Sequence, residues 1–162
     1  MSKIKWQNKK IALLGLGNEN QAVFIWLLKH GAKDITICDK NENLKSKILN
    51  LKSTSKNLKL KYQLDRNYLK NLQQFDVVFR TPGIPYLTSE IQQAKKAGVE
   101  ISSQTKLFFD LCPAKIIGVT GTKGKGTTVS LTTAILKAKN SKLKAQIYCG
   151  GNIGQAPIWF LD

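Results

Sequence analysis

The sequence has few of the residues that build disulfide or metal-bound frameworks. Its three cysteines, Cys38, Cys112 and Cys149, form no CxxC pair, and His30 is the only histidine among 162 residues. This pattern argues against a disulfide framework and against a zinc site, so we expect buried thiols. Long apolar runs are also missing, because the longest, residues 22–28, is too short to cross a bilayer. With no secretory signal pattern at the N-terminus, we expect a cytoplasmic protein with no membrane partner.

Arginine and acidic residues are scarce, whereas lysine is abundant. Lys and Arg together number 26 against 10 Asp and Glu, which gives a net charge of +16, and Arg66 and Arg80 are the only arginines. Such a charge is compatible with a nucleic-acid partner. The lysines are scattered, however, and aromatic residues do not alternate with them as on a surface that stacks bases. We therefore interpret most of the charge as a solvated surface and keep nucleic-acid binding as a minor alternative.

An apolar segment, residues 116–119, leads into a glycine-rich stretch that is followed by a helical pattern over 129–136. This order of strand, turn and helix is typical of a loop that binds polyphosphates. Glycines let backbone N–H groups face the phosphates, Lys125 can reach the outer ones, and Thr127 or Thr128 would ligate Mg²⁺. The predicted nucleotide contacts are Gly121, Thr122, Lys123, Gly124, Lys125, Gly126, Thr127 and Thr128.

The spacing of this loop departs from the common GxxxxGK[ST] pattern. Gly126 stands where that pattern requires a hydroxyl, so the hydroxyl is displaced by one position. The alternative is an ordinary glycine-rich turn between a strand and a helix. A further strand is predicted over 145–149, before a second glycine-rich turn at 150–154.

The first half of the chain shows the same order of elements. A strand ending at Leu14 leads into Gly15-Leu16-Gly17 and a helix over 21–30, and a second strand over 35–39 ends in Asp39. In a dinucleotide-binding fold this acid accepts hydrogen bonds from ribose hydroxyls. The fingerprint is incomplete, because Asn20 takes the place of the third glycine. A structural turn without a ligand is the alternative.

The remaining patterns predict a Rossmann-like parallel sheet. A rigid turn, residues 81–85, follows a buried strand at its carboxyl end, where open α/β sheets bind ligands. The other predicted elements are a surface helix over 41–55, strands over 58–62, 75–80 and 99–102, a helix over 89–97, and a helix or connector over 104–112.

The predicted class is therefore α/β, with a Rossmann-like domain over 1–112. From 113 to 162 we expect the first strand, phosphate loop, helix and strand of a P-loop ATPase domain. We expect this second domain to be incomplete, because a segment this short cannot cover both faces of a parallel sheet.

Four motifs in this order resemble those of the Mur ligase family. They are Gly15-Leu16-Gly17, residues 80–85, residues 118–128 and Gly150-Gly151-Asn152-Ile153-Gly154. The resemblance covers that family's N-terminal domain and the opening of its central ATPase domain. It implies an ATP-dependent ligase that adds D-glutamate to UDP-N-acetylmuramoyl-L-alanine in peptidoglycan precursor synthesis, here as a fragment inactive alone. Gly126 is closer to the loop of folylpolyglutamate synthases, a related ligase family, but the Rossmann-like first half argues against a folate enzyme.

The resemblance also implies roles for individual residues. Lys125 would stabilise the transferring phosphoryl group of ATP, Thr127 would ligate Mg²⁺, and Asn152 would contact the nucleotide-sugar substrate near its reacting end. The expected contacts of the uridine diphosphate group are Gly15, Gly17, Asn18, Glu19, Asp39, Lys40, Thr81, Pro82 and Gly83. We expect a monomer. A nucleotide-binding or nucleic-acid-binding module without catalysis remains the competing hypothesis.

Overall fold

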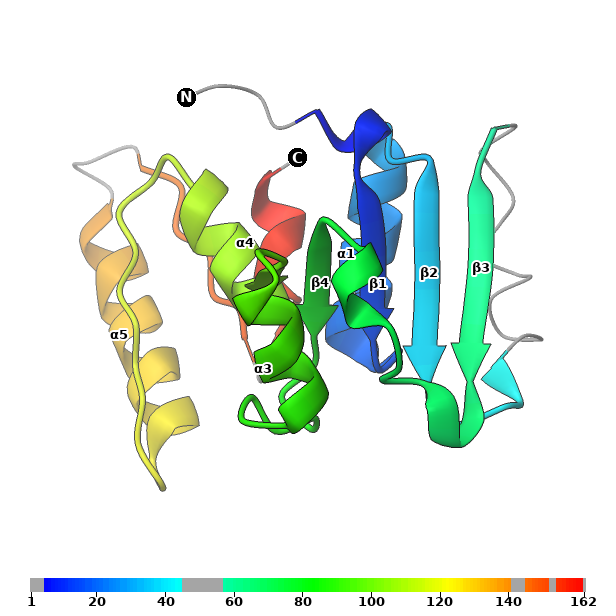
Figure 1. Cartoon of the computed structure of the whole chain (residues 1–162). Coiled ribbons are helices and arrows are strands. Elements are labelled where there is room, and N and C mark those ends of the chain that lie inside the picture. The colour runs from blue at the N-terminus through cyan, green and yellow to red at the C-terminus, as the bar shows by residue number, and fades with distance from the viewer. Residues whose placement is uncertain (1–4, 45–56, 141–144, 152–153, 162) are drawn as a thin grey trace.

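Five parallel strands form one sheet in the order β3-β2-β1-β4-β5, as the computed structural model shows (Figure 1). The structure describes residues 5–44, 57–140, 145–151 and 154–161. The strands are β1 (Lys10–Leu14), β2 (Asp34–Asp39), β3 (Lys59–Leu64), β4 (Val77–Arg80) and β5 (Glu100–Ser102). All five carboxyl ends lie at one edge of the sheet, so the loops that follow them are neighbours.

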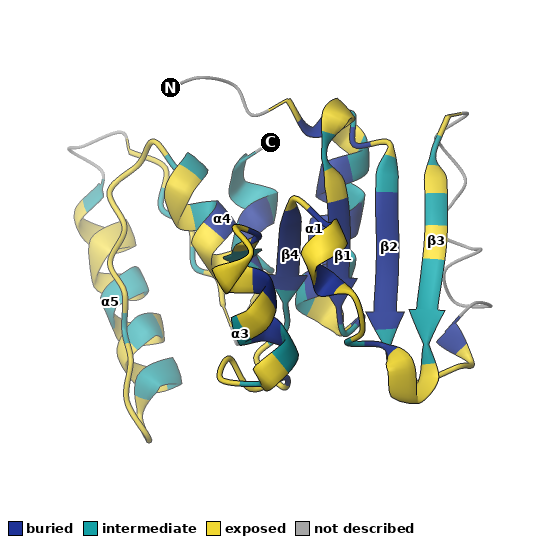
Figure 2. Cartoon of the chain, viewed as in Figure 1, coloured by how far each residue is buried: buried dark blue, intermediate teal, exposed yellow. Residues whose placement is uncertain are grey.

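Helices cover both faces of this sheet because its central strands are apolar on both sides. Along β1, Ile11 and Leu13 belong to one hydrophobic core, and Ala12 and Leu14 belong to the other. The first core includes residues of α1 (Asn18–Lys29) and of α4 (Gln104–Leu111). The second core includes residues of α3 (Ser89–Lys96) and of the 3-10 turn η3 (Leu72–Gln74). The two cores make the architecture three-layered, and the central strands β1, β2 and β4 are largely buried, as their dark blue colour in Figure 2 shows.

The predicted α/β class with a Rossmann-like parallel sheet is confirmed. The strands expected around residues 10–14, 35–39, 58–62, 75–80 and 99–102 all form, within two residues of their predicted bounds. Helix α1 begins at Asn18, earlier than predicted, because Gly17 is extended (φ −69°, ψ 176°) and serves as its N-cap. The segment 104–112 is a helix rather than a connector. The surface helix expected over 41–55 lies mostly outside the described residues.

The second half of the chain departs from the prediction. Helix α5 (Lys125–Lys139) forms, but residues 116–120 and 145–149 are not strands and have no pairing partner in the described residues. Ile117 is 67% exposed and Tyr148 is 58% exposed, although both have strand-like sequence surroundings. The helix itself buries no residue, and it stands apart from the sheet (Figure 1, Figure 2). The prediction of strands on both sides of the glycine-rich loop was wrong, because a strand needs a neighbour to satisfy its backbone hydrogen bonds and neither segment has one among the described residues.

One short turn from the end of the chain packs back onto the first half. The turn η5 (Pro157–Leu161) lies against α4 and α1. Its Ile158 is fully buried in the same core as Trp26 and Leu107. The first hydrophobic core therefore includes side chains from both halves of the sequence.

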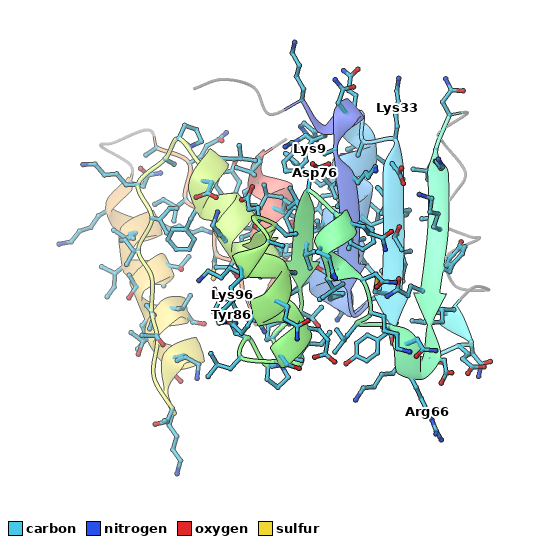
Figure 3. All side chains as sticks on the ribbon, in the orientation of Figure 1. Lys9, Lys33, Arg66, Asp76, Tyr86 and Lys96 are labelled. Carbon is cyan, nitrogen blue, oxygen red and sulfur yellow. The ribbon has the colours of Figure 1, made fainter. Side chains whose placement is uncertain are left out.

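Surface charge and thiols complete the comparison with the sequence. Lys33 and Arg66 extend away from opposite ends of the sheet (Figure 3), as expected for charge spread over a solvated surface. No helix within the described ranges is long and apolar enough to cross a membrane.

The three cysteines differ in burial. Cys38 is buried, and this burial, together with the negative charge of Asp39, raises the pKa of its thiol to about 12. Cys112 and Cys149 are only half-buried, so the expectation of three buried thiols was wrong for these two.

Candidate functional site

The order of strands reverses between β1 and β4, and this is where open α/β sheets leave a crevice for a ligand. The turn after β1 meets the turn after β4 there. Thr81 donates its backbone N–H to the carbonyl of Leu14 at 3.1 Å. Gly15 has φ +75°, and a Cβ at this position would lie 2.6 Å from the Thr81 hydroxyl oxygen. Only glycine fits this contact, so the first predicted motif residue is required by the crevice itself.

Asp39, at the end of β2, forms a hydrogen bond that stabilises the turn after β1. One carboxylate oxygen accepts the N–H of Leu16 at 2.7 Å, and the other accepts the N–H of Asn41 at 2.9 Å. A carboxylate has further lone pairs, so Asp39 can still accept a ligand hydroxyl. Lys40 is exposed, and its ammonium lies 5.7 Å from the centre of the Tyr68 ring. The structure thus brings Asp39 to the crevice and points Lys40 toward the adjacent loop.

Asn20 connects the two strands of the crevice, a role that sequence reasoning missed. Its side-chain amide donates to the carbonyls of Leu14 (3.0 Å), Gly15 (2.8 Å) and Phe79 (3.1 Å), and the residue is fully buried. Its oxygen Oδ1 has no partner in the described part of the chain. The only sequence signal was a missing glycine, whereas the structure shows an asparagine that ties the end of β1 to the end of β4.

Arg80, also missed by sequence reasoning, organises the turn after β4. Its guanidinium donates to the carbonyl of Thr81 at 3.0 Å and to the carbonyl of Ile84. The ring of Tyr86 lies near two cations, since the Arg80 guanidinium is 5.7 Å and the Lys95 ammonium 5.4 Å from its centre. Two prolines and these contacts hold the turn in one shape, with its predicted contacts Pro82 and Gly83 exposed to solvent.

A groove with a volume of about 1410 Å³ begins at this crevice and extends to the inner side of α5. Its wall at the crevice comes from the start of α1, the turn after β4 and the start of α4. The lining residues of that end are Gly17, Asn18, Glu19, Thr81, Pro82 and Gln104. Five of these six are predicted substrate contacts, and Gln104 is not. The site therefore has the position and the open shape of a ligand crevice.

The glycine-rich loop before α5 is shaped by two glycines in conformations that side chains disfavour. Gly121 has φ +152°, and Gly124 has φ +73° and caps the helix. The Lys125 ammonium donates to the carbonyl of Gly121 at 2.5 Å, so the side chain folds back over the loop. A cationic group held over a helix N-terminus, where the first N–H groups lack intrahelical partners, suits a polyphosphate.

The two threonines after this loop differ in availability. The Thr128 hydroxyl donates to the carbonyl of Gly124 at 3.0 Å, within the first turn of α5. Thr127 is exposed, and its hydroxyl makes no hydrogen bond in the parts of the chain described. Of the two candidate Mg²⁺ ligands, Thr127 is therefore the one whose hydroxyl is available to a ligand.

The structure brings together some predicted residues and not others. Gly15 contacts Thr81, and Asp39 accepts the N–H of Leu16 in the same turn. The groove is lined by Gly17, Asn18, Glu19, Thr81 and Pro82, but not by Gly15, Asp39, Lys40 or Gly83. Among the described residues, the groove is lined by Gly118 to Thr120 and again from Val129, but not by residues 121–128. Asn152 lies outside the described residues. The crevice and the glycine-rich loop before α5 are thus separate, and both lie on the side of the molecule where the strands end (Figure 1).

Comparison with known proteins places this geometry in a family. The profile described as "Mur ligase MurD-like, N-terminal domain" matches residues 9–103. The UDP-N-acetylmuramoylalanine–D-glutamate ligase of Acetivibrio thermocellus is 44% identical over 155 residues, which are 94% of this chain and 31% of that protein. The ligase of the same name from Clostridium novyi is 39% identical over 148 residues, 91% of this chain and 31% of its own length.

A solved structure is also similar. The pseudomurein peptide ligase type C from Methanothermus fervidus aligns with a TM-score of 0.46 and 22% identity, over 81% of this chain and 26% of that one. The chain spans about a third of the length of the curated relatives that it matches. On the match over residues 9–103, the chain belongs to the Mur ligase family, with a MurD-like N-terminal domain.

Proposed function

We propose that this chain is the substrate-binding N-terminal part of an ATP-dependent ligase that joins D-glutamate to UDP-N-acetylmuramoyl-L-alanine. The relatives from Acetivibrio thermocellus and Clostridium novyi bear the name of that ligase. The observation that carries the proposal is the crevice between β1 and β4, where the glycine turn, Asp39 and Thr81 meet. Parallel sheets of this order bind nucleotides at such a crevice.

The uridine diphosphate part of the substrate would occupy this crevice. Backbone N–H groups from Gly17 to Glu19 are at the start of α1, where they have no intrahelical partner and favour phosphate oxygens. Gly15 allows close approach, Asp39 would accept a hydroxyl, and Lys40, Thr81, Pro82 and Gly83 would flank the ligand. Asn152 would contact the sugar end of the substrate near the reacting carboxylate.

The phosphate loop would bind ATP for the chemical step. The γ-phosphate would pass to the L-alanine carboxylate, and the amine of D-glutamate would attack the acyl phosphate, forming the C–N bond as phosphate leaves. Lys125 would stabilise negative charge on the transferring group, and residues 121–128 would hold the polyphosphate through backbone N–H groups and hydroxyls. Mg²⁺, when bound at Thr127, would neutralise charge on the phosphates.

Two domains with separate tasks would follow from this assignment. Residues 1–112 would bind the uridine-linked substrate, and residues 113–162 would begin the ATP-binding domain. The fragment alone would bind substrate and show no turnover. We place the reaction in the cytoplasm and expect a monomer without a nucleic-acid partner.

Calorimetric titration of the purified chain with UDP-N-acetylmuramoyl-L-alanine tests the proposal. We expect saturable binding to one site, with duplex DNA as the control titrant that gives no saturable signal at physiological salt. Absence of any heat from the uridine ligand at millimolar concentration would contradict the proposal. A DNA affinity that falls steeply with salt, combined with indifference to uridine nucleotides, would support the nucleic-acid-binding alternative.

Replacement of Glu19 by glutamine should strengthen binding of the diphosphate. The carboxylate lies in the first turn of α1 and lines the groove, so it repels a dianionic ligand that binds to the same helix end. We expect affinity for UDP to rise roughly fivefold at low salt, as a change of about 1 kcal/mol implies, and the gain to shrink in 0.5 M salt.

The matched control is Glu90→Gln, in the first turn of α3 and outside the groove lining. It should leave UDP affinity unchanged. If Glu19→Gln weakens binding instead, the side chain is a direct contact of the ligand and the repulsion argument is wrong.

A further inference from the structure

Gln104 carries a buried polar group that the fold leaves without a partner. It is the first residue of α4, it is 2% exposed, and its amide nitrogen Nε2 makes no hydrogen bond within the described residues. A buried donor without an acceptor is destabilising, so native proteins contain few of them, and a ligand that accepts the hydrogen bond is one way to satisfy such a group. The N-terminus of α4 has an ordinary cap, because the Ser103 hydroxyl accepts the backbone N–H of Lys106 at 3.1 Å.

The sheet register places Gln104 beside the crevice. Phe79 of β4 pairs with Ser102 of β5, and Thr81 and Gln104 each follow two residues later, just beyond the ends of these neighbouring parallel strands. Gln104 lines the same groove as Thr81 and the α1 start, and α4 lies in contact with α1. The loops after β1, β4 and β5 thus contribute to one end of the groove.

The groups around this end of the groove favour an acceptor-rich ligand. The start of α1 offers backbone N–H groups, Thr81 offers a hydroxyl, and Gln104 offers a side-chain N–H₂. Glu19 is the one carboxylate among the described groove-lining residues at this end. A ligand with several oxygen acceptors would satisfy the donor that the protein leaves unpaired.

We propose that the Gln104 amide donates a hydrogen bond to an oxygen of the diphosphate–sugar part of the uridine-linked substrate. This inference rests on the proposed function, and it adds a third strand end to the substrate site. Gln104 would then act as a binding and specificity residue: it would select ligands that present an oxygen beyond the uridine. Uridine itself, which lacks the diphosphate, would not use the contact.

Calorimetry with three ligands tests this assignment. UDP-N-acetylmuramoyl-L-alanine, UDP and uridine are titrated into the whole chain and into Gln104→Leu, which keeps the apolar stem and removes the donor. We expect affinity for the substrate to fall roughly tenfold, the usual effect of losing a hydrogen bond to a charged or strongly polar acceptor, and affinity for uridine to stay the same. The UDP result assigns the acceptor: a loss with UDP points to the diphosphate, and a loss confined to the full substrate points to the sugar.

The thermal midpoint separates a binding role from a structural one. Removing an unpaired buried donor should leave the midpoint of Gln104→Leu unchanged or raise it, whereas a structural role requires it to fall. Gln104→Glu is the second variant, because a carboxylate there would repel phosphate and weaken substrate binding at least as much. Gln93→Leu, at an exposed position of α3, is the matched control and should leave the affinity for each of the three ligands unchanged.

The outcomes distinguish this inference from the proposed function. If the unmodified chain binds none of the three ligands, the proposed function fails. If it binds the substrate and both Gln104 variants bind it equally well, only the role of Gln104 is overturned. A lowered midpoint with unchanged affinity would assign Gln104 to the fold instead.

Discussion

When Lys125 is replaced by alanine in a complete ligase that carries this sequence, amide formation should fall by roughly 10²–10³-fold, the usual effect of removing one preorganised group that stabilises transition-state charge. Affinity for the uridine-linked substrate should change by less than about twofold. The reason is spatial, because Lys125 lies in the loop before α5, whereas the crevice lies between β1 and β4 (Figure 1). Product formation and substrate affinity are measured on the same preparation.

Lys137→Ala is the matched control for this experiment. Lys137 is an exposed lysine in the last turn of the same helix, so its loss removes the same charge at the opposite end. Lys137→Ala should leave the rate of amide formation and the affinity for the uridine-linked substrate near their original values. Equal loss of catalysis and of substrate binding in Lys125→Ala would refute the separation of the two sites.

Asn20→Asp should be the most destabilising single substitution at the crevice. It replaces an N–H₂ group that donates to three carbonyl oxygens with a carboxylate that faces the same oxygens in a fully buried position. Loss of the hydrogen bonds and burial of an unpaired charge together cost about 3–5 kcal/mol, a large share of the stability of a domain. Denaturant unfolding of the two proteins at pH 7.5 measures this difference.

The loss of stability caused by Asn20→Asp should grow as the pH rises. Burial among carbonyl oxygens raises the pKa of the new carboxyl group above its unfolded value of about 4. The folded state then holds a proton that the unfolded state has lost, so stability relative to the original protein falls as pH rises from about 4 toward 8. The exposed neighbour Asn18→Asp should stay within about 0.5 kcal/mol of the original at every pH. A pH-independent difference for Asn20→Asp would contradict the buried-charge explanation.

The first half of the fold was predictable because its signals are local. Buried strands such as Lys10–Leu14 and Asp34–Asp39 have apolar residues on both faces, and glycine turns mark their ends. The same reasoning failed at 116–120 and 145–149, where β-branched and apolar residues also suggested strands. Strand formation depends on a partner, and no described segment pairs with either of these two. Apolar composition alone could not supply that information.

The candidate site was predictable where the backbone itself is constrained. Gly15 could be predicted from the Gly-x-Gly turn after a strand, because its positive φ and its close contact with Thr81 require glycine. Asp39 could be predicted from its place at the end of a buried strand. Asn20, Arg80 and Gln104 were missed, because no sequence pattern marks the hydrogen bonds of Asn20 and Arg80 or the burial of Gln104. Asn20 reaches Phe79, 59 positions away, and no pattern in the sequence marks such a bond.

The placement of Ile158 has a consequence for how this protein is made. The core-facing sides of α1 and α4 emerge from the ribosome well before the turn that covers them, Pro157–Leu161. Until that turn is synthesised, apolar surface around Trp26 and Leu107 stays open to solvent and to the chaperones that recognise such surface. Translation of the later segment therefore sets the time at which the earlier sheet acquires its complete packing.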